Sequence, residues 1–267
     1  MQPDPEVVAH YEDRYDEDTR LTRDGFGQLE LERTRILLDR YLPEPPVTIL
    51  DVGGGPGIYA IELGEAGYDV ELIDIVPLHI RQATERGVRA QLGDARELPI
   101  RTKSQDGVLL LGPLYHLPER EDRMAALGEA ARVGKVGAPV FGAAISRFAS
   151  AIDSLDSGYV DDTEFMRIVM RDLEDGKHIN QTDNPGYFTT AFFHHPDELR
   201  AEFEEAGLAD VEVLAIEGIG WAAADIDERM EDDDKRAAML DLLARLESEP
   251  SILGASPHIL AVGFVQG

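Results

Sequence analysis

Four glycines crowd the segment LDVGGGPG, Leu50–Gly57, which begins with an apolar run and leads into a helical pattern. Glycines let the backbone approach a ligand that a Cβ atom would exclude, and the N–H groups at the start of a helix attract anionic groups. Asp51 precedes the glycines, and Asp74 ends the next apolar run, where a carboxylate can accept two ribose hydroxyls. The spacing predicts a site for a cofactor that contains a nucleoside.

The glycines can be counted in two frames. Gly55–Ala60 fits the pattern G-x-G-x-x-A, so a nicotinamide dinucleotide stays open as the ligand. The other frame sets Asp51 at the strand end, followed by glycines at alternate positions (Gly53, Gly55, Gly57). A wide loop of this kind suits a ligand with a charged amino-acid tail. This second frame resembles motif I of the class I methyltransferases that depend on S-adenosylmethionine (SAM).

The resemblance extends past the glycine loop, over residues 47–145 and 196–265. Asp94 stands where that family places an acid near the adenine amino group, and Asp106–Leu117 is similar to its fourth-strand motif, whose end faces the methionine part of SAM. The resemblance implies SAM as the cofactor. It is expected to contact Asp51, Gly53, Gly55, Gly57, Asp74, Ile75, Asp94, Ala95, Leu111 and Gly112. Arg20 is added because an arginine in the N-terminal arm could pair with the carboxylate of SAM.

Methyl transfer from a sulfonium needs alignment, exclusion of water and sometimes removal of a proton, and it requires no metal and no protein nucleophile. Members of the family that methylate nucleobase amines carry Asn, Asp or Ser, then Pro-Pro and an aromatic residue, after the fourth strand. This chain has Gly112 at the first of these positions, which favours a small-molecule acceptor.

Tyr115 and His116 are the candidate catalytic residues, because His116 could take a proton from an O–H, N–H or S–H acceptor. The alternative is a histidine at a helix start that only donates or accepts a hydrogen bond. Residues expected on the acceptor side are Tyr11, Tyr15, Phe192 and His194.

Apolar runs alternate with helical patterns along the chain, which predicts a doubly wound α/β fold. The predicted strands are 47–53, 69–75, 88–95, 106–112, 138–146, 210–218 and 257–265. The resemblance implies a Rossmann-like seven-stranded sheet with an antiparallel last strand. Residues 225–248 are predicted to form one very acidic helix.

Two segments lie outside this alternation. Residues 1–45 are predicted as an N-terminal arm and a helix. Residues 146–194 show helix-like patterns without a clear strand and hold five of the nine phenylalanines, so they are predicted as a lid-like insertion over the acceptor. Residues 1–267 are expected to form a single methyltransferase domain.

Charge and composition limit the kinds of partner and the cellular location that are expected. The net charge is −28, with 53 acidic against 25 basic residues, so nucleic acid is not expected as a partner. The acidity indicates either adaptation to concentrated salt or an ordinary acidic protein. With no cysteine, no membrane-length apolar stretch and no signal-like start, a cytoplasmic location and no membrane partner are expected. An NAD(P)-dependent oxidoreductase and a non-catalytic SAM-binding protein remain alternatives, and the oligomeric state is open.

Overall fold

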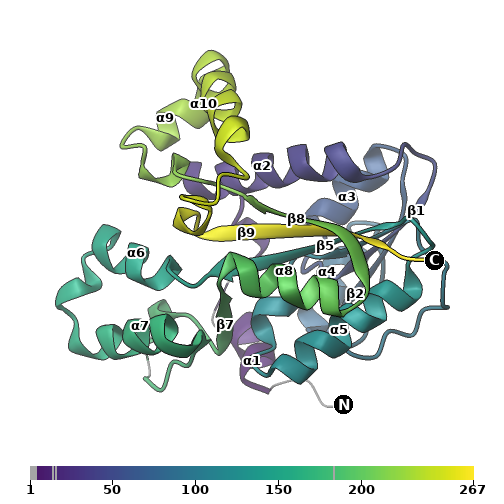
Figure 1. Cartoon of the computed structure of the whole chain (residues 1–267), viewed down its shortest axis with the longest axis horizontal. Helices are drawn as coiled ribbons and strands as arrows, with labels where there is room; N and C mark the ends of the chain where they lie inside the picture. Colours follow the sequence, from purple (N-terminus) through teal and green to yellow (C-terminus); the bar gives the residue numbers. More distant parts are fainter. Residues whose placement is uncertain (1–4, 14, 16, 183) are drawn as a thin grey trace.

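A single twisted sheet forms the centre of the molecule in the computed structural model, which describes residues 5–13, 15, 17–182 and 184–267 (Figure 1). The seven principal strands are β1 (Thr48–Val52), β2 (Asp69–Asp74), β3 (Arg89–Leu92), β4 (Gly107–Leu110), β5 (Pro139–Ser146), β8 (Leu208–Ala215) and β9 (His258–Val265). They lie in the order β3-β2-β1-β4-β5-β9-β8. Among these seven strands, β9 runs in the direction opposite to the others, antiparallel to its neighbours β5 and β8. The predicted Rossmann-like sheet is therefore confirmed.

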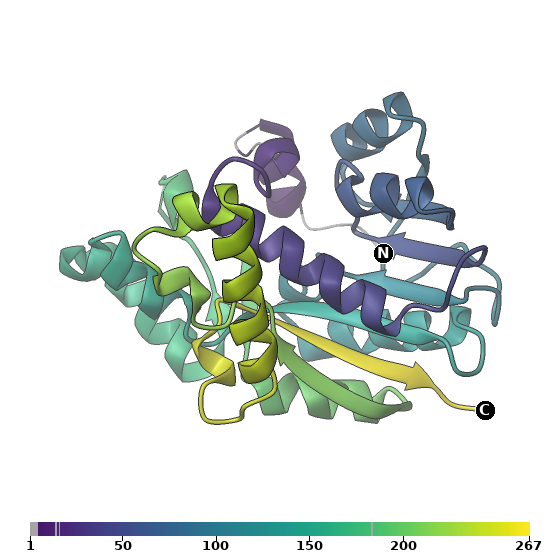
Figure 2. The ribbon, with the colours of Figure 1, turned by 90° about the horizontal axis from the view of Figure 1, so that it is seen from above.

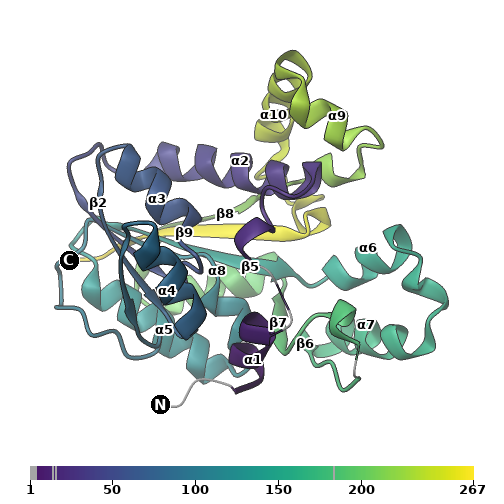
Figure 3. The same cartoon turned by 180° about the vertical axis from the view of Figure 1, so that it is seen from behind.

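Helices cover both faces of the sheet (Figures 1 and 3). On one face lie α2 (Gly25–Tyr41), α3 (Ile58–Glu65) and α4 (Pro77–Glu85); on the other lie α5 (Arg120–Val133) and α8 (Pro196–Glu205). All eight residues of β5 are buried, because this strand packs against helices on both sides. The apolar runs of the sequence thus form the buried interior, and the polar residues that end them reach the carboxyl edge of the sheet.

The acidic segment predicted as one helix is two. The chain forms α9 (Ile226–Glu231) and α10 (Asp233–Leu246), and the prediction of a continuous helix over 225–248 is wrong. Asp232 lies between them in an extended conformation, and its side chain accepts the N–H of Lys235 as an N-cap. An aspartate favours this position over the interior of a helix. Both helices pack near α2 (Figure 2).

The insertion also differs from its prediction, because it contributes strands. It holds α6 (Ala149–Asp156), α7 (Thr163–Asp175), β6 (Lys177–His178) and β7 (Ala191–His194). β7 runs parallel to the last two residues of β5 and antiparallel to β6. All four residues of β7 are buried, so this short apolar run extends the sheet next to the end of β5. The arm supplies α1 (Pro5–Asp13) and the 3₁₀ turn η1 (Glu17–Thr19). Within the described ranges, no helix is long and apolar enough to cross a membrane.

Candidate functional site

A cavity of about 650 Å³ lies at the carboxyl ends of β1, β2, β3 and β4. Its floor is formed by residues 51–56, 74–76, 93–96 and 111–113, and the arm lines its other side with Tyr11 and with residues near η1. Ligands of open α/β sheets bind outside the carboxyl ends of the strands, where the strand order reverses. This cavity therefore joins the segments on which the sequence placed the cofactor.

The glycine loop folds tightly over Asp51. Three of its glycines have positive φ, at Gly53 (68°), Gly55 (58°) and Gly57 (92°). A Cβ atom at Gly54 would lie 2.3 Å from a carboxylate oxygen of Asp51, so no larger residue can close this turn. Asp51 is fully buried, and neither of its carboxylate oxygens has a hydrogen-bond partner among the described residues. Burial, together with the charge of Asp74, raises the pKa of Asp51 to about 7.

Asp74, at the end of β2, is bonded to the glycine loop. Its Oδ2 accepts the N–H of Gly55 at 2.9 Å and its Oδ1 accepts the N–H of Val76 at 2.8 Å. His79, in the first turn of α4, lies 3.3 Å from Oδ1. A carboxylate oxygen has a second lone pair, so Asp74 can still accept hydroxyl groups from the cavity. Ile75 follows it in the cavity wall.

Asp94 and Ala95 also line the cavity, but the carboxylate of Asp94 is engaged. Arg96 donates to it from both its backbone N–H and its guanidinium, the closest contact being 2.7 Å, and also binds Asp122 at 2.9 Å. Burial raises the pKa of Asp94, but the bonds from Arg96 outweigh this and hold it below its usual value. Asp94 thus closes the turn after β3 while it remains at the cavity wall.

The chain that leaves β4 carries the candidate catalytic residues. Leu111, Gly112, Tyr115 and His116 all line the cavity, and Pro113–His116 form a 3₁₀ turn. The hydroxyl of Tyr11, from α1, lies 2.8 Å from Nε2 of His116, and Nδ1 of His116 lies 3.5 Å from the carbonyl oxygen of Thr190. Because a carbonyl oxygen only accepts, the tautomer of His116 with its proton on Nδ1 can donate to Thr190 and accept the hydroxyl of Tyr11 at Nε2. Burial raises the pKa of Tyr11 well above its usual value, so its hydroxyl is protonated at neutral pH.

Ion pairs fasten the arm across the cavity. Arg20 donates to Glu17 at 2.9 Å and to both carboxylate oxygens of Glu30, at 2.6 and 3.0 Å. Asp18 pairs at 2.5 Å with Arg86, the residue that follows α4. Glu17, Asp18 and Arg20 all line the cavity. Arg20 therefore reaches the predicted cofactor site with its guanidinium already paired to two carboxylates.

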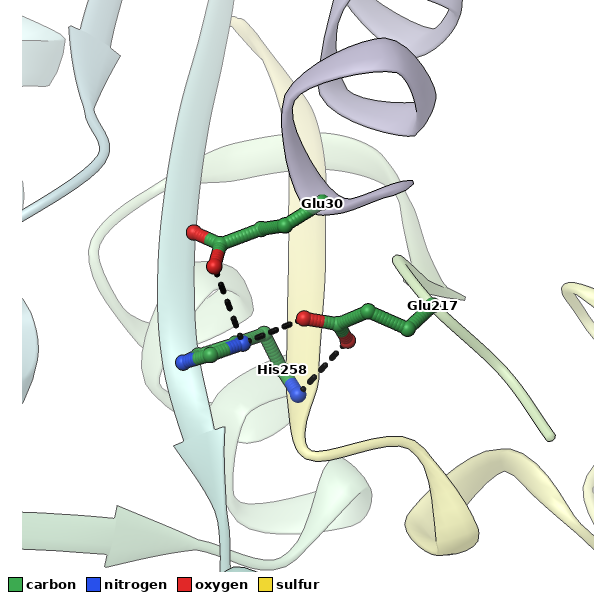
Figure 4. Close-up of side chains that lie close together, drawn as sticks. All are labelled: Glu30, Glu217 and His258. Carbon is green, nitrogen blue, oxygen red and sulfur yellow. Dashed lines mark hydrogen bonds and ion pairs between the residues drawn. The ribbon is translucent and has the colours of Figure 1, made fainter. Parts of the chain in front are cut away.

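A second charged group shares Glu30 with Arg20, and Figure 4 shows its three side chains, Glu30, Glu217 and His258. Nδ1 of His258, at the start of β9, bonds to Glu217 and lies 3.7 Å from Glu30, and the backbone N–H of His258 donates to Glu217 at 3.0 Å. Burial lowers the pKa of His258, but the charges of Glu217 and Glu30 outweigh it and raise this pKa to about 9. One ligand atom from each of the three side chains lies within 4.8 Å of the others, a spacing that a metal could use. The protonated imidazole and Arg20 already pair with the two carboxylates, so the group is an ion-pair cluster that anchors the arm.

Phe192 and His194 do not reach the cavity, contrary to the expectation that they face the acceptor. Phe192 lies under the guanidinium of Arg123, with the Cζ atom 3.7 Å from the ring centroid. His194 is fully buried and bonds to Glu202 at 3.2 Å. Among the described residues of 146–194, none lines the cavity. Tyr15 is also outside the lining, where it stacks on His10 at 5.2 Å.

Several lining residues were not predicted from the sequence: Glu17, Asp18, Tyr59, His79, Arg86 and Arg96. Tyr59 follows Gly57 in the first turn of α3, so its place beside the loop could have been inferred. Arg96 lies two residues after Asp94, so its place in the cavity wall could also have been inferred. The contacts of Glu17 and Asp18 depend on how the arm folds back, and no local pattern signals them.

Comparison with known proteins agrees with the geometry. A family model described as "Methyltransferase domain" matches residues 49–137. Two mycobacterial proteins, from Mycobacterium tuberculosis and Mycobacterium bovis, each named "Uncharacterized methyltransferase", are 33% identical over 102 residues. That match covers 38% of this chain and 40% of the length of each relative.

Solved structures with the same fold include a SAM-dependent methyltransferase from Thermotoga maritima, with a TM-score of 0.59, 16% identity and coverage of 98% of this chain and 99% of that one. Phosphoethanolamine N-methyltransferase 2 of Haemonchus contortus, solved with SAM, has a TM-score of 0.56 and 16% identity and covers 89% of this chain and 53% of that one. The [4+2]-cyclase SpnF also shares the fold, with a TM-score of 0.51, 15% identity and coverage of 88% and 81%. Fold alone therefore does not fix the reaction.

Residues 49–137 match a methyltransferase domain, and the chain has the fold of SAM-dependent methyltransferases of known structure, so the prediction of a class I SAM-dependent methyltransferase domain, for which SAM is the cofactor, is supported by both comparisons. The residues present fit that cofactor. A buried carboxylate without a partner among the described residues, at Asp51, suits the ammonium group of SAM, and Asp74 suits its ribose hydroxyls. The nicotinamide alternative has no such support.

Proposed function

We propose that this chain transfers the methyl group of SAM to a small-molecule acceptor inside the cavity. The observation that carries the proposal is the arm, which lines the cavity opposite the glycine loop with Tyr11, Glu17 and Arg20. Pockets for small molecules range from about 300 to 1,000 Å³. A volume of about 650 Å³ leaves room for a compact acceptor beside the cofactor.

The charge of the cavity favours a neutral or cationic acceptor. Acids outnumber arginines among the described lining residues by eight to three. The acids are Glu17, Asp18, Asp51, Glu62, Asp74, Asp94, Glu119 and Asp122, and the arginines are Arg20, Arg86 and Arg96. All three arginines are already paired with carboxylates. A phosphate or carboxylate on the acceptor would be repelled, and the same charge disfavours a nucleic acid.

Tyr11 and His116 can take the proton that the acceptor loses. SAM supplies the methyl group and leaves as S-adenosylhomocysteine. An acceptor O–H or N–H placed against the Tyr11 oxygen can pass its proton there as Tyr11 gives its own proton to Nε2 of His116. Tyr115 lies beside this pair, with its ring 4.7 Å from that of His116, and contributes to the wall against which the acceptor is oriented.

Two measurements test the proposal. Calorimetry should show binding of SAM and S-adenosylhomocysteine and no binding of NAD. Incubation with methyl-labelled SAM and a panel of small amines, phenols, thiols and phosphorylated analogues should then label members of the neutral or cationic classes. NAD binding in preference to SAM would contradict the proposal. SAM binding without transfer to any member of a broad panel would favour the non-catalytic alternative.

The insertion and the location remain predictions. The described residues of the insertion do not line the cavity, but Thr190 contacts two segments near it. Its carbonyl oxygen lies 3.5 Å from Nδ1 of His116, and its hydroxyl donates to Glu6 of α1. We propose that it supports the arm from outside. A single domain and a cytoplasmic location are retained from the sequence.

A further inference from the structure

Arg123 is an almost fully buried cation that does not line the cavity, although two of its hydrogen-bond partners, Leu117 and Pro118, do. It sits in α5 with 2% of its surface exposed. Its Nη1 group donates to the carbonyl oxygens of Leu117 at 2.9 Å and Pro118 at 3.0 Å. Its Nε and Nη2 groups both donate to Glu202 of α8, with a closest distance of 2.7 Å. All three nitrogens of the guanidinium are therefore engaged.

The two carbonyls belong to the residues directly after His116. Leu117 is the C-cap of the 3₁₀ turn that carries Tyr115 and His116, and Pro118 follows it. A buried guanidinium that donates to both carbonyls fixes where this turn ends, because a turn that moved away would leave the buried charge without these hydrogen bonds. The geometry requires arginine, since lysine offers no planar fork to reach two carbonyls and a carboxylate at once.

The other partners of Arg123 come from the insertion and from α8. Phe192 of β7 packs its ring against the guanidinium face at 3.7 Å. His194, two residues on, bonds to the same Glu202 and meets the Phe192 ring edge-on at 4.7 Å. Burial raises the pKa of Glu202, but the bonds from His194 and Arg123 outweigh it and hold this pKa at about 2. The turn after β4 and two elements far from it in sequence, β7 and α8, therefore converge on one arginine.

We propose that Arg123 is a positioning residue for His116: it fixes the turn after β4, and through it the Tyr11–His116 hydrogen bond, while Phe192, His194 and Glu202 hold Arg123 in place. The proposal rests on the proposed function in one respect only, that His116 takes part in methyl transfer. It also assigns Phe192 and His194, which do not line the cavity, the role of holding Arg123.

Arg147 provides a matched control. It also lies over the Phe192 ring, at 5.6 Å, is 3% exposed, and binds the Phe193 carbonyl at 2.7 Å and Glu198 at 2.6 Å. It therefore clamps the same strand, β7, through partners that do not belong to the turn after β4. A general loosening of the insertion would follow from either arginine, whereas loss of the turn would follow only from Arg123.

The test compares Arg123→Lys with Arg147→Lys by ¹⁵N NMR of the histidine rings, which needs neither SAM nor an acceptor. The Nδ1 and Nε2 shifts of His116 report its tautomer and its bond to Tyr11. Arg123→Lys should move these shifts toward those of a solvent-exposed imidazole, and Arg147→Lys should leave them unchanged. Equal changes in both variants, or unchanged His116 shifts in Arg123→Lys, would overturn the proposal.

If Arg123→Lys does not fold, Glu202→Gln takes its place, because it keeps a hydrogen-bonding group beside Arg123 but removes the charge. His116 shifts intermediate between the wild type and a free imidazole support the proposal, and unchanged shifts contradict it. Where an acceptor has been found, Arg123→Lys should lower kcat about 10- to 100-fold, as misplacement by about 1 Å does, with SAM affinity nearly unchanged. Failure of SAM to bind the wild type would instead refute the proposed function, whereas the NMR comparison alone decides whether Arg123 positions His116.

Discussion

The fully buried Asp51 leads to a prediction about how SAM binding depends on pH. The pKa of this carboxyl is raised to about 7, first by burial and then by the charge of Asp74. Below that pH the ligand-free protein holds a proton on Asp51. The ammonium group of SAM favours the ionised carboxylate, so binding in mild acid must release this proton and affinity must fall as the pH falls through 7.

The magnitude follows from the titration. If Asp51 stays ionised in the complex, affinity should drop about 50-fold between about pH 7 and pH 5, or about 2.3 kcal/mol. At about pH 6, roughly 0.9 of a proton should leave per SAM bound. The folding stability of the free protein depends on pH in the opposite direction to SAM affinity. Because the folded-state pKa is raised, the stability contributed by protonated Asp51 is fully present below about pH 4 and is lost as the pH rises through 7.

Calorimetry in two buffers of different ionisation enthalpy measures this proton release directly. Asp51→Asn is the matched variant, since it keeps the shape and has no proton to lose; its SAM affinity should be weaker and independent of pH. Methylthioadenosine, which lacks the amino-acid tail, is the matched ligand, and its affinity for the wild type should not depend on pH. A wild-type protein that releases no proton near pH 6, or an Asn variant with the same pH slope, would refute the assignment of Asp51 to the ammonium group.

Three further predictions concern Asp74, Tyr11 and the net charge. Asp74→Ala should weaken SAM binding by about 1.5–3 kcal/mol, which is the scale of lost hydrogen bonds to a charged group. Calorimetry on a variant that keeps the wild-type circular dichroism measures this loss, and unchanged affinity would show that Asp74 does not bind SAM. Tyr11→Phe should lower turnover about 10- to 100-fold with unchanged SAM affinity, because the hydroxyl that relays the proton is lost; equal losses in both would assign Tyr11 to the cofactor. If the net charge of −28 reflects adaptation to salt, the melting temperature should rise steeply from dilute buffer to molar KCl as repulsion is screened; a curve indifferent to salt would exclude that adaptation.

Most of the principal strands were predictable because they are short apolar runs, several of which are closed by glycine or an acid. Asp51 and Asp74 were predictable for the same reason, since the carboxyl ends of parallel strands meet at one edge. β7 was missed because only four residues, Ala191–His194, carry its signal, and they lie within a segment of helical pattern. The helix break at Asp232 was missed because its acidic neighbours on both sides hide the capping signal of a single aspartate.

Residue type did not reveal which way the aromatics of the insertion face. Phe192 and His194 were expected at the acceptor because phenylalanines outside the regular alternation must pack against something. Their partners are Arg123 and Glu202, and Arg123 lies about 70 residues earlier in the chain, so only the tertiary structure shows the pairing. Arg20 lies in the cavity wall, but its pairing with Glu17 and Glu30 also depends on the folded arm.

A crystal structure of the protein with S-adenosylhomocysteine tests the central claim most directly. The ligand should lie in the cavity between the glycine loop and the arm, with its amino group on Asp51, its ribose hydroxyls on Asp74, and space for an acceptor beside Tyr11 and His116. A ligand bound elsewhere, or one whose amino group avoids Asp51 while Tyr11 and His116 lie apart from its sulfur, would contradict it.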